Sequence, residues 1–84
     1  MKQEEMILKA MLENPTKEVW DARDFQRGAY FVGYEATARM SELARKYPSL
    51  IKVGKDGRYR TLSINWEDKE IINFLRKLLE IEGE

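Results

Sequence analysis

Cationic side chains concentrate in the middle of this 84-residue sequence. Residues 35–61 contain seven Lys and Arg against three Asp and Glu, although the whole chain has a net charge of zero. The segments on either side, 1–34 and 62–84, each carry a net negative charge. Ammonium and guanidinium groups bind phosphate, and a cluster of them repels itself unless an anion lies nearby. The pattern therefore predicts a surface that binds a polyanion.

The residue types that the chain lacks limit other chemistry. There is no Cys and no His, so disulfides, thiolate metal ligands and the commonest general base are absent. The sequence has no "GxxxxGK" phosphate loop, and its carboxylates are scattered. We therefore expect no enzyme activity, no metal site and no cofactor.

The length and patterning predict one small domain over residues 1–84, without a repeat or a linker. No segment approaches the roughly 18 to 20 apolar residues that span a bilayer. The first residues, "MKQEEMILKAMLEN", carry Glu where a signal peptide has an apolar core. We expect a soluble, cytoplasmic protein that does not contact a membrane.

Three elements are predicted before the cationic segment. Apolar residues recur at helical spacing in "EEMILKAMLEN", which predicts a first helix, and Pro15 directly after this segment ends it. The strand formers in "KEVW", residues 17–20, predict a short strand. Asp21 can then cap a short helix over residues 22–26, which Gly28 can close.

A third helix is predicted over residues 35–47, and Pro48 ends it. At 100° per residue one side of this helix is apolar and the other side is polar. The expected inward side consists of Ala36, Met40, Leu43, Ala44 and Tyr47, and the outward side of Ala38, Arg39, Ser41, Glu42, Arg45 and Lys46.

A β-hairpin is predicted next, because "LIKV" and "RYRTLSI" flank the turn signal "KDG". A two-residue turn at Asp56 and Gly57 pairs Lys55 with Arg58 and Ile51 with Leu62. The base of the hairpin is then apolar and its tip cationic. Cations clustered at the tip repel one another, so folding stability alone explains their clustering poorly. A bound polyanion would relieve the repulsion.

Taken in order, the elements resemble a winged helix-turn-helix domain. "ATARMSELARKYP" followed by "LIKVGKDGRYRTLSI" resembles the recognition helix and wing of small winged-helix proteins, including phage and mobile-element ones. The resemblance implies an α+β fold: a three-helix core, a small antiparallel sheet with a wing hairpin, and a C-terminal helix. In that fold "KEVW" pairs near "TLSI".

The resemblance also implies a function, which is binding of double-stranded DNA by a small transcriptional regulator. The third helix would enter the major groove and the wing would contact the backbone. The DNA-binding residues would then be Arg39, Ser41, Glu42, Arg45, Lys46, Lys52, Lys55, Arg58 and Arg60. Winged helices also serve as protein–protein interaction modules, and this is the alternative function.

The end of the chain predicts a fourth helix over residues 65–82, with Asn65 as its cap. Its apolar residues cover a wider arc than the ~100° stripe that one packing contact requires. Two interpretations stand: a wide contact with the first helix of the same chain, or a homodimer formed by terminal helices. The residues of the homodimer interface would be Ile72, Leu75 and Leu79.

Overall fold

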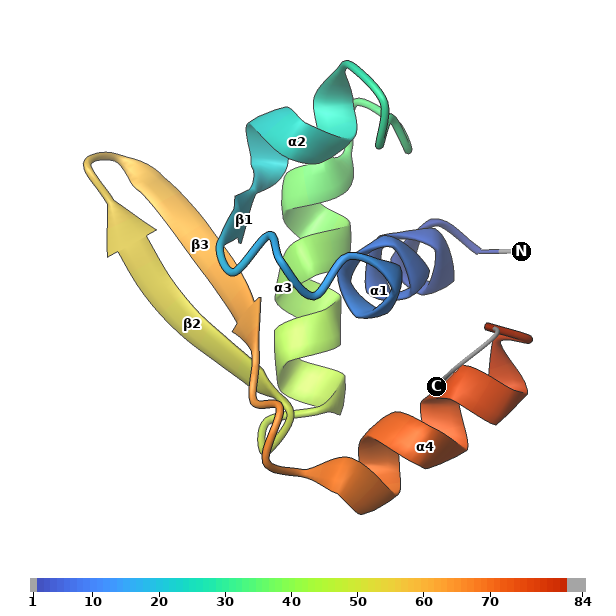
Figure 1. Cartoon of the computed structure of the whole chain (residues 1–84). Helices are drawn as coiled ribbons and strands as arrows, with labels where there is room; N and C mark the ends of the chain where they lie inside the picture. The colour runs from blue at the N-terminus through green and yellow to red at the C-terminus, as the bar shows by residue number, and fades with distance from the viewer. Residues whose placement is uncertain (1, 82–84) are drawn as a thin grey trace.

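The computed structural model of the chain describes residues 2–81, and within them four helices lie to one side of a small antiparallel sheet (Figure 1). The fold class is therefore α+β. The strand order in the sheet is β1-β3-β2. The elements are α1 (Gln3–Glu13), β1 (Trp20–Asp21), α2 (Ala22–Gln26), α3 (Ala36–Lys46), β2 (Ile51–Asp56), β3 (Tyr59–Ile64) and α4 (Lys69–Leu78).

The core lies where α1, α3 and the base of the sheet meet. Trp20 of β1 stacks on Phe25 of α2 with their ring centroids 5.3 Å apart, and both side chains are fully buried. Strand β1 is shorter than the predicted strand over residues 17–20, because a turn occupies the chain up to Lys17. It nevertheless pairs where expected, since Trp20 lies opposite Leu62.

The hairpin has a different turn from the predicted one. Its two turn residues are Gly57 and Arg58, and Asp56 pairs with Tyr59. Gly57 adopts a φ of +62°, the positive value that a type II′ turn requires at its first central position. The prediction of a turn at Asp56 and Gly57 was wrong by one residue.

The corrected register moves every partner along the hairpin by two residues. Ile51 lies opposite Ile64, and both are buried at the base of the sheet. Lys55 lies opposite Arg60, so two cations share one cross-strand position. A two-residue slip keeps each side chain on its face, so the cationic tip is retained.

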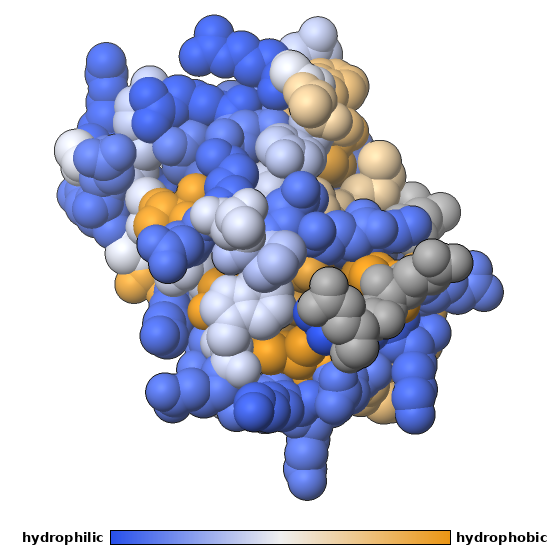
Figure 2. Space-filling view, viewed as in Figure 1, coloured by the Kyte–Doolittle hydropathy of each residue, from blue (hydrophilic) through white to orange (hydrophobic). Residues whose placement is uncertain are grey.

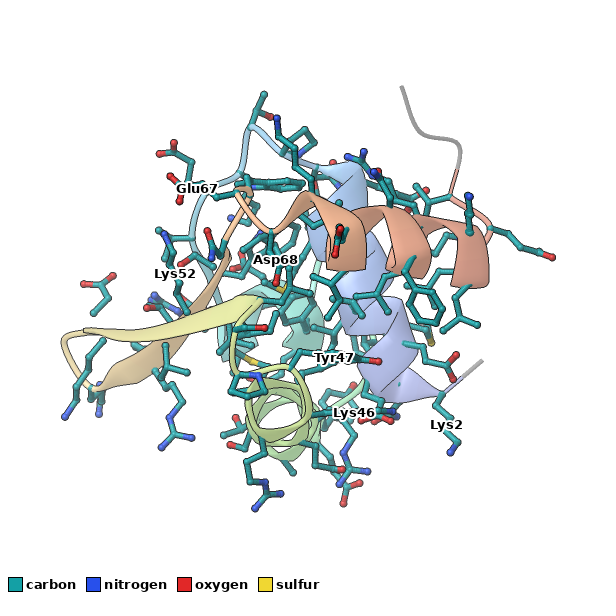
Figure 3. All side chains as sticks on the ribbon, turned by 90° about the horizontal axis from the view of Figure 1, so that it is seen from below. Lys2, Lys46, Tyr47, Lys52, Glu67 and Asp68 are labelled. Atoms are coloured by element: carbon teal, nitrogen blue, oxygen red, sulfur yellow. The ribbon has the colours of Figure 1, made fainter. Side chains whose placement is uncertain are left out.

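Helix α3 buries the side that its periodicity predicts. Ala36, Met40 and Leu43 are fully buried, and Ala44 and Tyr47 pack partly against the core. The outward positions are exposed or half-buried. In Figure 3, which looks along α3, this outward side points away from α4.

Helix α4 begins four residues later than predicted. The backbone N–H of Asn65 donates to the carbonyl of Leu50 at 2.7 Å, and its side chain donates to the carbonyl of Ser49. These bonds hold residue 65 at the end of the sheet, so the chain makes a turn before the helix starts. The last predicted helical residue, 82, lies outside the described residues.

The three leucine and isoleucine side chains proposed for a dimer interface are core residues. Ile72, Leu75 and Leu79 are 4%, 1% and 4% exposed. They belong to the hydrophobic core of this chain, where α4 contacts α1. A partner could not reach them without unfolding α4, so this choice of interface residues was wrong.

The surface of the domain is mainly polar. Figure 2 shows hydrophilic side chains over most of one face, with hydrophobic surface in separate patches. Within residues 2–81 no helix is both long enough and apolar enough to cross a membrane.

Helix α2 owes its position to a local cap at Asp21. This carboxylate accepts a hydrogen bond from the backbone N–H of Arg23 at 2.8 Å and two more from the Arg23 side chain. The backbone N–H of Asp21 in turn donates to the Asp24 carboxylate at 2.9 Å, which completes a capping box. The hydrogen bonds from the Arg23 side chain hold the pKa of Asp21 below its ordinary value of 3.8.

The cap predicts a loss of stability at low pH. A folded carboxylate with a lowered pKa stays ionised where the unfolded chain takes up a proton. Its contribution is therefore complete at neutral pH and falls as the pH drops below 3.8. We expect Asp21→Ala to lower the free energy of unfolding by about 1 to 2 kcal/mol at pH 7. Asp21→Asn, which keeps an acceptor, should lose less.

Urea titrations at pH 7 and pH 3 measure both effects. The difference in unfolding free energy between wild type and Asp21→Asn should shrink at the lower pH, because the wild-type carboxylate is then partly protonated. An equal difference at both values would contradict the assigned role of the ionised carboxylate.

Candidate nucleic-acid interface

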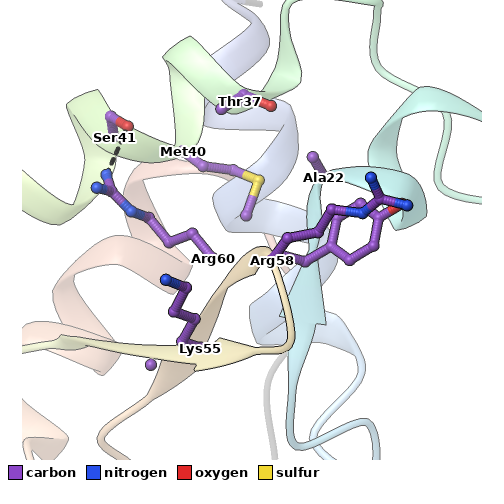
Figure 4. A pocket seen from close by; sticks show the side chains of 9 residues that line it. Ala22, Thr37, Met40, Ser41, Lys55, Arg58 and Arg60 are labelled. Atoms are coloured by element: carbon purple, nitrogen blue, oxygen red, sulfur yellow. Dashed lines mark hydrogen bonds between the residues drawn. The ribbon is translucent and has the colours of Figure 1, made fainter.

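A groove runs between α3 and the hairpin on the cationic side of the molecule (Figure 4). Its volume is about 510 Å³. Met40 lies between the helix and the hairpin, and cationic side chains of the hairpin surround it. The residues that line the groove are Ala22, Thr37, Met40, Ser41, Gly54, Lys55, Arg58, Tyr59 and Arg60.

The lining of the groove contains three cations and no acid. Within residues 2–81, Lys55, Arg58 and Arg60 form no salt bridge. Lys55 and Arg60 also lie at one cross-strand position, where like charges repel. In a chain with no net charge, this leaves a local positive potential that an anion would neutralise.

One row of α3 side chains faces this groove. Thr37, Ser41 and Arg45 are spaced four residues apart, which places them on one side of the helix. Thr37 and Ser41 line the groove, and Arg45 is exposed at the end of the row. Arg45 has no salt-bridge partner among the described residues. The row presents two hydroxyls and one free guanidinium.

Arg60 connects the hairpin to the helix. Its Nη1 donates a hydrogen bond to the Ser41 hydroxyl at 3.0 Å. This bond joins β3 to α3 across the groove (Figure 4). Arg60 and Ser41 therefore bridge the groove as well as contributing polar groups to it.

Tyr59 forms one wall of the groove and is held by a stacked arginine. The Arg23 guanidinium lies 3.9 Å from the centroid of the Tyr59 ring, and Arg23 is itself paired with Asp21 at 2.7 Å. Arg58 lies 5.9 Å from the same ring. Tyr59 thus links the hairpin to the start of α2, which supports the tip of the hairpin.

A second row of α3 faces α1 instead of the groove. Arg39 Nε lies 2.9 Å from Glu42 Oε1, and Lys46 Nζ lies 3.6 Å from Glu4 Oε1 of α1. Both cations are therefore partly neutralised by acids. Among the residues that the winged-helix resemblance assigns to DNA, Arg39, Glu42 and Lys46 stand apart from the groove.

Lys52 is also separated from the groove. Lys52 pairs with Ser63 and precedes Lys55 by three residues on β2. Because successive side chains on a strand point to opposite faces, the two lysines lie on opposite faces of the hairpin. Figure 3 shows Lys52 on the side of the hairpin that bears Glu67 and Asp68, away from α3. The groove thus brings together Ser41, Lys55, Arg58 and Arg60, and Arg45 follows Ser41 on the same row of α3.

The sequence analysis did not identify Thr37 and Arg23 as part of this site. Thr37 could have been found, because it precedes Ser41 and Arg45 at the same four-residue spacing. Arg23 could not have been found from the sequence, since only the folded chain brings α2 to the tip of the hairpin. Within residues 2–81 no group of three or more His, Cys, Asp or Glu side chains could hold a metal ion.

Comparison of the chain with protein-family models, with curated proteins and with solved structures found no match. The site is therefore interpreted from its own geometry and charge.

Proposed function

We propose that the chain binds double-stranded DNA in the manner of a winged helix-turn-helix domain, as a small transcriptional regulator would. The observation that supports this most is the acid-free groove, in which Lys55, Arg58 and Arg60 have no anionic partner among the described residues. Phosphate contacts supply most of the affinity of proteins for DNA. The order of the elements and the pairing of β1 with β3 also suit a winged helix.

The dimensions of the elements suit a duplex. Helix α3 has 11 residues and is about 16 Å long at 1.5 Å per residue. The major groove of B-DNA is about 12 Å wide and admits one α-helix. With α3 in the major groove of the DNA, the hairpin beside it would reach the adjoining phosphates. Arg45 is the side chain in this arrangement that could read a guanine, because it is exposed and unpaired among the described residues.

A titration of labelled random-sequence duplex at two salt concentrations tests the proposal. Fluorescence anisotropy should show binding that weakens steeply as the salt concentration rises, because bound cations are released from DNA. Poly-glutamate of matched charge serves as the comparison, since an acidic protein partner could use the same cations. Tighter binding of poly-glutamate than of DNA would favour the protein-interaction module instead.

A gain of affinity is expected when the acid on α3 is neutralised. Glu42 holds Arg39 at 2.9 Å, outside the groove between α3 and the hairpin. Both residues nevertheless belong to α3, which in this arrangement would lie in the DNA major groove between two rows of phosphates. Glu42→Gln keeps the shape of the side chain and removes the charge. Releasing one cation for a phosphate contact should raise the affinity for random duplex by about two- to eight-fold near 0.1 M salt.

Glu13→Gln is the matched control for this variant, because Glu13 is an exposed acid at the end of α1, which does not enter the DNA in this arrangement. It should leave the affinity almost unchanged. Weaker binding by Glu42→Gln would mean that the carboxylate itself accepts a hydrogen bond from a base such as cytosine.

A further inference from the structure

The side of α4 that faces away from the core carries large apolar side chains. Phe74 is 63% exposed and Leu78 is 60% exposed, one helical turn apart. Ile71 lies on the same side of the helix, half-buried against the core. We call these three residues the α4 stripe. The stripe is distinct from Ile72, Leu75 and Leu79, which the chain buries itself.

Two opposite charges border the stripe on one flank. Glu70 and Lys77 are seven residues apart, so they occupy equivalent positions two turns apart on α4. Both are exposed, and neither forms a salt bridge within residues 2–81. They are about 10 Å apart along the helix at 1.5 Å per residue, which is too far for them to pair with each other.

These charges match each other when two α4 helices lie antiparallel. A two-fold axis near Phe74 brings equivalent flanking positions of the two helices face to face, as in antiparallel coiled coils. Glu70 of each copy then lies beside Lys77 of the other. One interface thus gains two Glu–Lys pairs and covers four exposed apolar side chains.

We propose that a second copy of this chain covers the α4 stripe, with the two α4 helices antiparallel. The proposal rests on the exposure of Phe74 and Leu78 and on the complementary placement of Glu70 and Lys77. It does not depend on DNA binding, because the groove and the α4 stripe share no residue. The contacting helix is only ten residues long, so the dimer is weak and forms at high protein concentration.

Sedimentation equilibrium of the full chain tests the dimer. From about 10 μM to about 1 mM, the range expected for a small interface, the mean mass should rise from one chain toward two. Phe74→Gln removes apolar area at an exposed helical position and should weaken the association by at least about tenfold. Circular dichroism should show an unchanged fold, because most of this ring is in solvent.

An exchange of charges tests the antiparallel geometry. Glu70→Lys replaces two attractive pairs with two repulsive ones and should weaken the dimer by about 5- to 30-fold. Glu70→Lys combined with Lys77→Glu restores both pairs with reversed signs and should recover the wild-type association. Glu13→Lys makes the same change of charge on α1 and should have little effect.

Three results would overturn the proposal: one-chain mass up to 1 mM, a dimer that Phe74→Gln does not weaken, or failure of the exchanged pair to recover association. DNA binding is read separately, from anisotropy at nanomolar protein, where the chain is monomeric. The proposed DNA function predicts that Glu70→Lys and Phe74→Gln leave that monomer affinity within about twofold of wild type, apart from the small long-range effect of the added charge.

Discussion

The double variant Lys55→Ala/Arg58→Ala should lose about 10- to 60-fold in affinity for every duplex near 0.1 M salt. Both residues line the groove, and neither has a salt-bridge partner among residues 2–81. Each phosphate contact that is lost removes about 0.9 from the slope of log affinity against log salt concentration, so the slope should flatten by about 1.8. Anisotropy titrations at four or five salt concentrations measure both quantities.

Lys52→Ala/Lys69→Ala is the matched control. It removes two exposed cations, one from the opposite face of the same hairpin and one from the start of α4. The slope of log affinity against log salt concentration should change by less than half as much as in Lys55→Ala/Arg58→Ala. Equal effects of the two variants would mean that only total charge matters, which would contradict a contact at the groove.

Arg45→Ala should alter sequence preference more than general affinity. Arg45 ends the row that begins at Thr37, and no acid among the described residues neutralises it. A bidentate contact from arginine to guanine is worth about 1 to 3 kcal/mol of discrimination at one base pair. An array of random duplexes should therefore show the preference at one position relaxed by about 5- to 150-fold.

Arg39→Ala separates the two rows of α3. Arg39 was predicted from the sequence together with Arg45, but it is paired with Glu42 on the side of the helix that faces α1. Its removal should leave the preference profile of the wild type intact. A profile that changes with Arg39→Ala and not with Arg45→Ala would show that the second row reads DNA.

The elements that local sequence determines were predicted well. Helix α2 has the bounds expected from its cap at Asp21, and Gly28 adopts a φ of +84° after it. The buried side of α3 follows directly from the 3.6-residue period. In both cases the signal lies within one or two turns of the residues concerned.

The errors occurred where distant residues decide the local structure. The hairpin turn is set by the packing of Ile51 against Ile64 at the base of the sheet, which a two-residue turn signal does not specify. The start of α4 is delayed because Asn65 bonds to the carbonyl of Leu50. The wide apolar arc of α4 left two interpretations open, and only the fold shows that Ile72, Leu75 and Leu79 face the core while Phe74 and Leu78 are exposed.

In the candidate site, too, the features that local sequence determines could be predicted, and those that depend on distant residues could not. The positive charge of residues 35–61 is evident from composition, and the groove gathers four of the predicted side chains: Ser41, Lys55, Arg58 and Arg60. The sequence could not show that Glu4 on α1 approaches Lys46, because more than forty positions separate them. Strand alternation does place Lys52 and Lys55 on opposite faces of the hairpin, but only the folded chain shows which of the two faces meets α3.

Chemical-shift mapping of the ¹⁵N-labelled chain against a duplex tests the proposed interface most directly. We predict that added DNA perturbs the amides of Thr37, Ser41 and Arg45 and those of residues 55–60, while α4, over Lys69–Leu78, stays largely unperturbed. The experiment is run below the concentration at which the chain self-associates. Perturbation concentrated on α4, or no perturbation at a DNA concentration tenfold above that of the protein, would contradict binding of DNA at the groove.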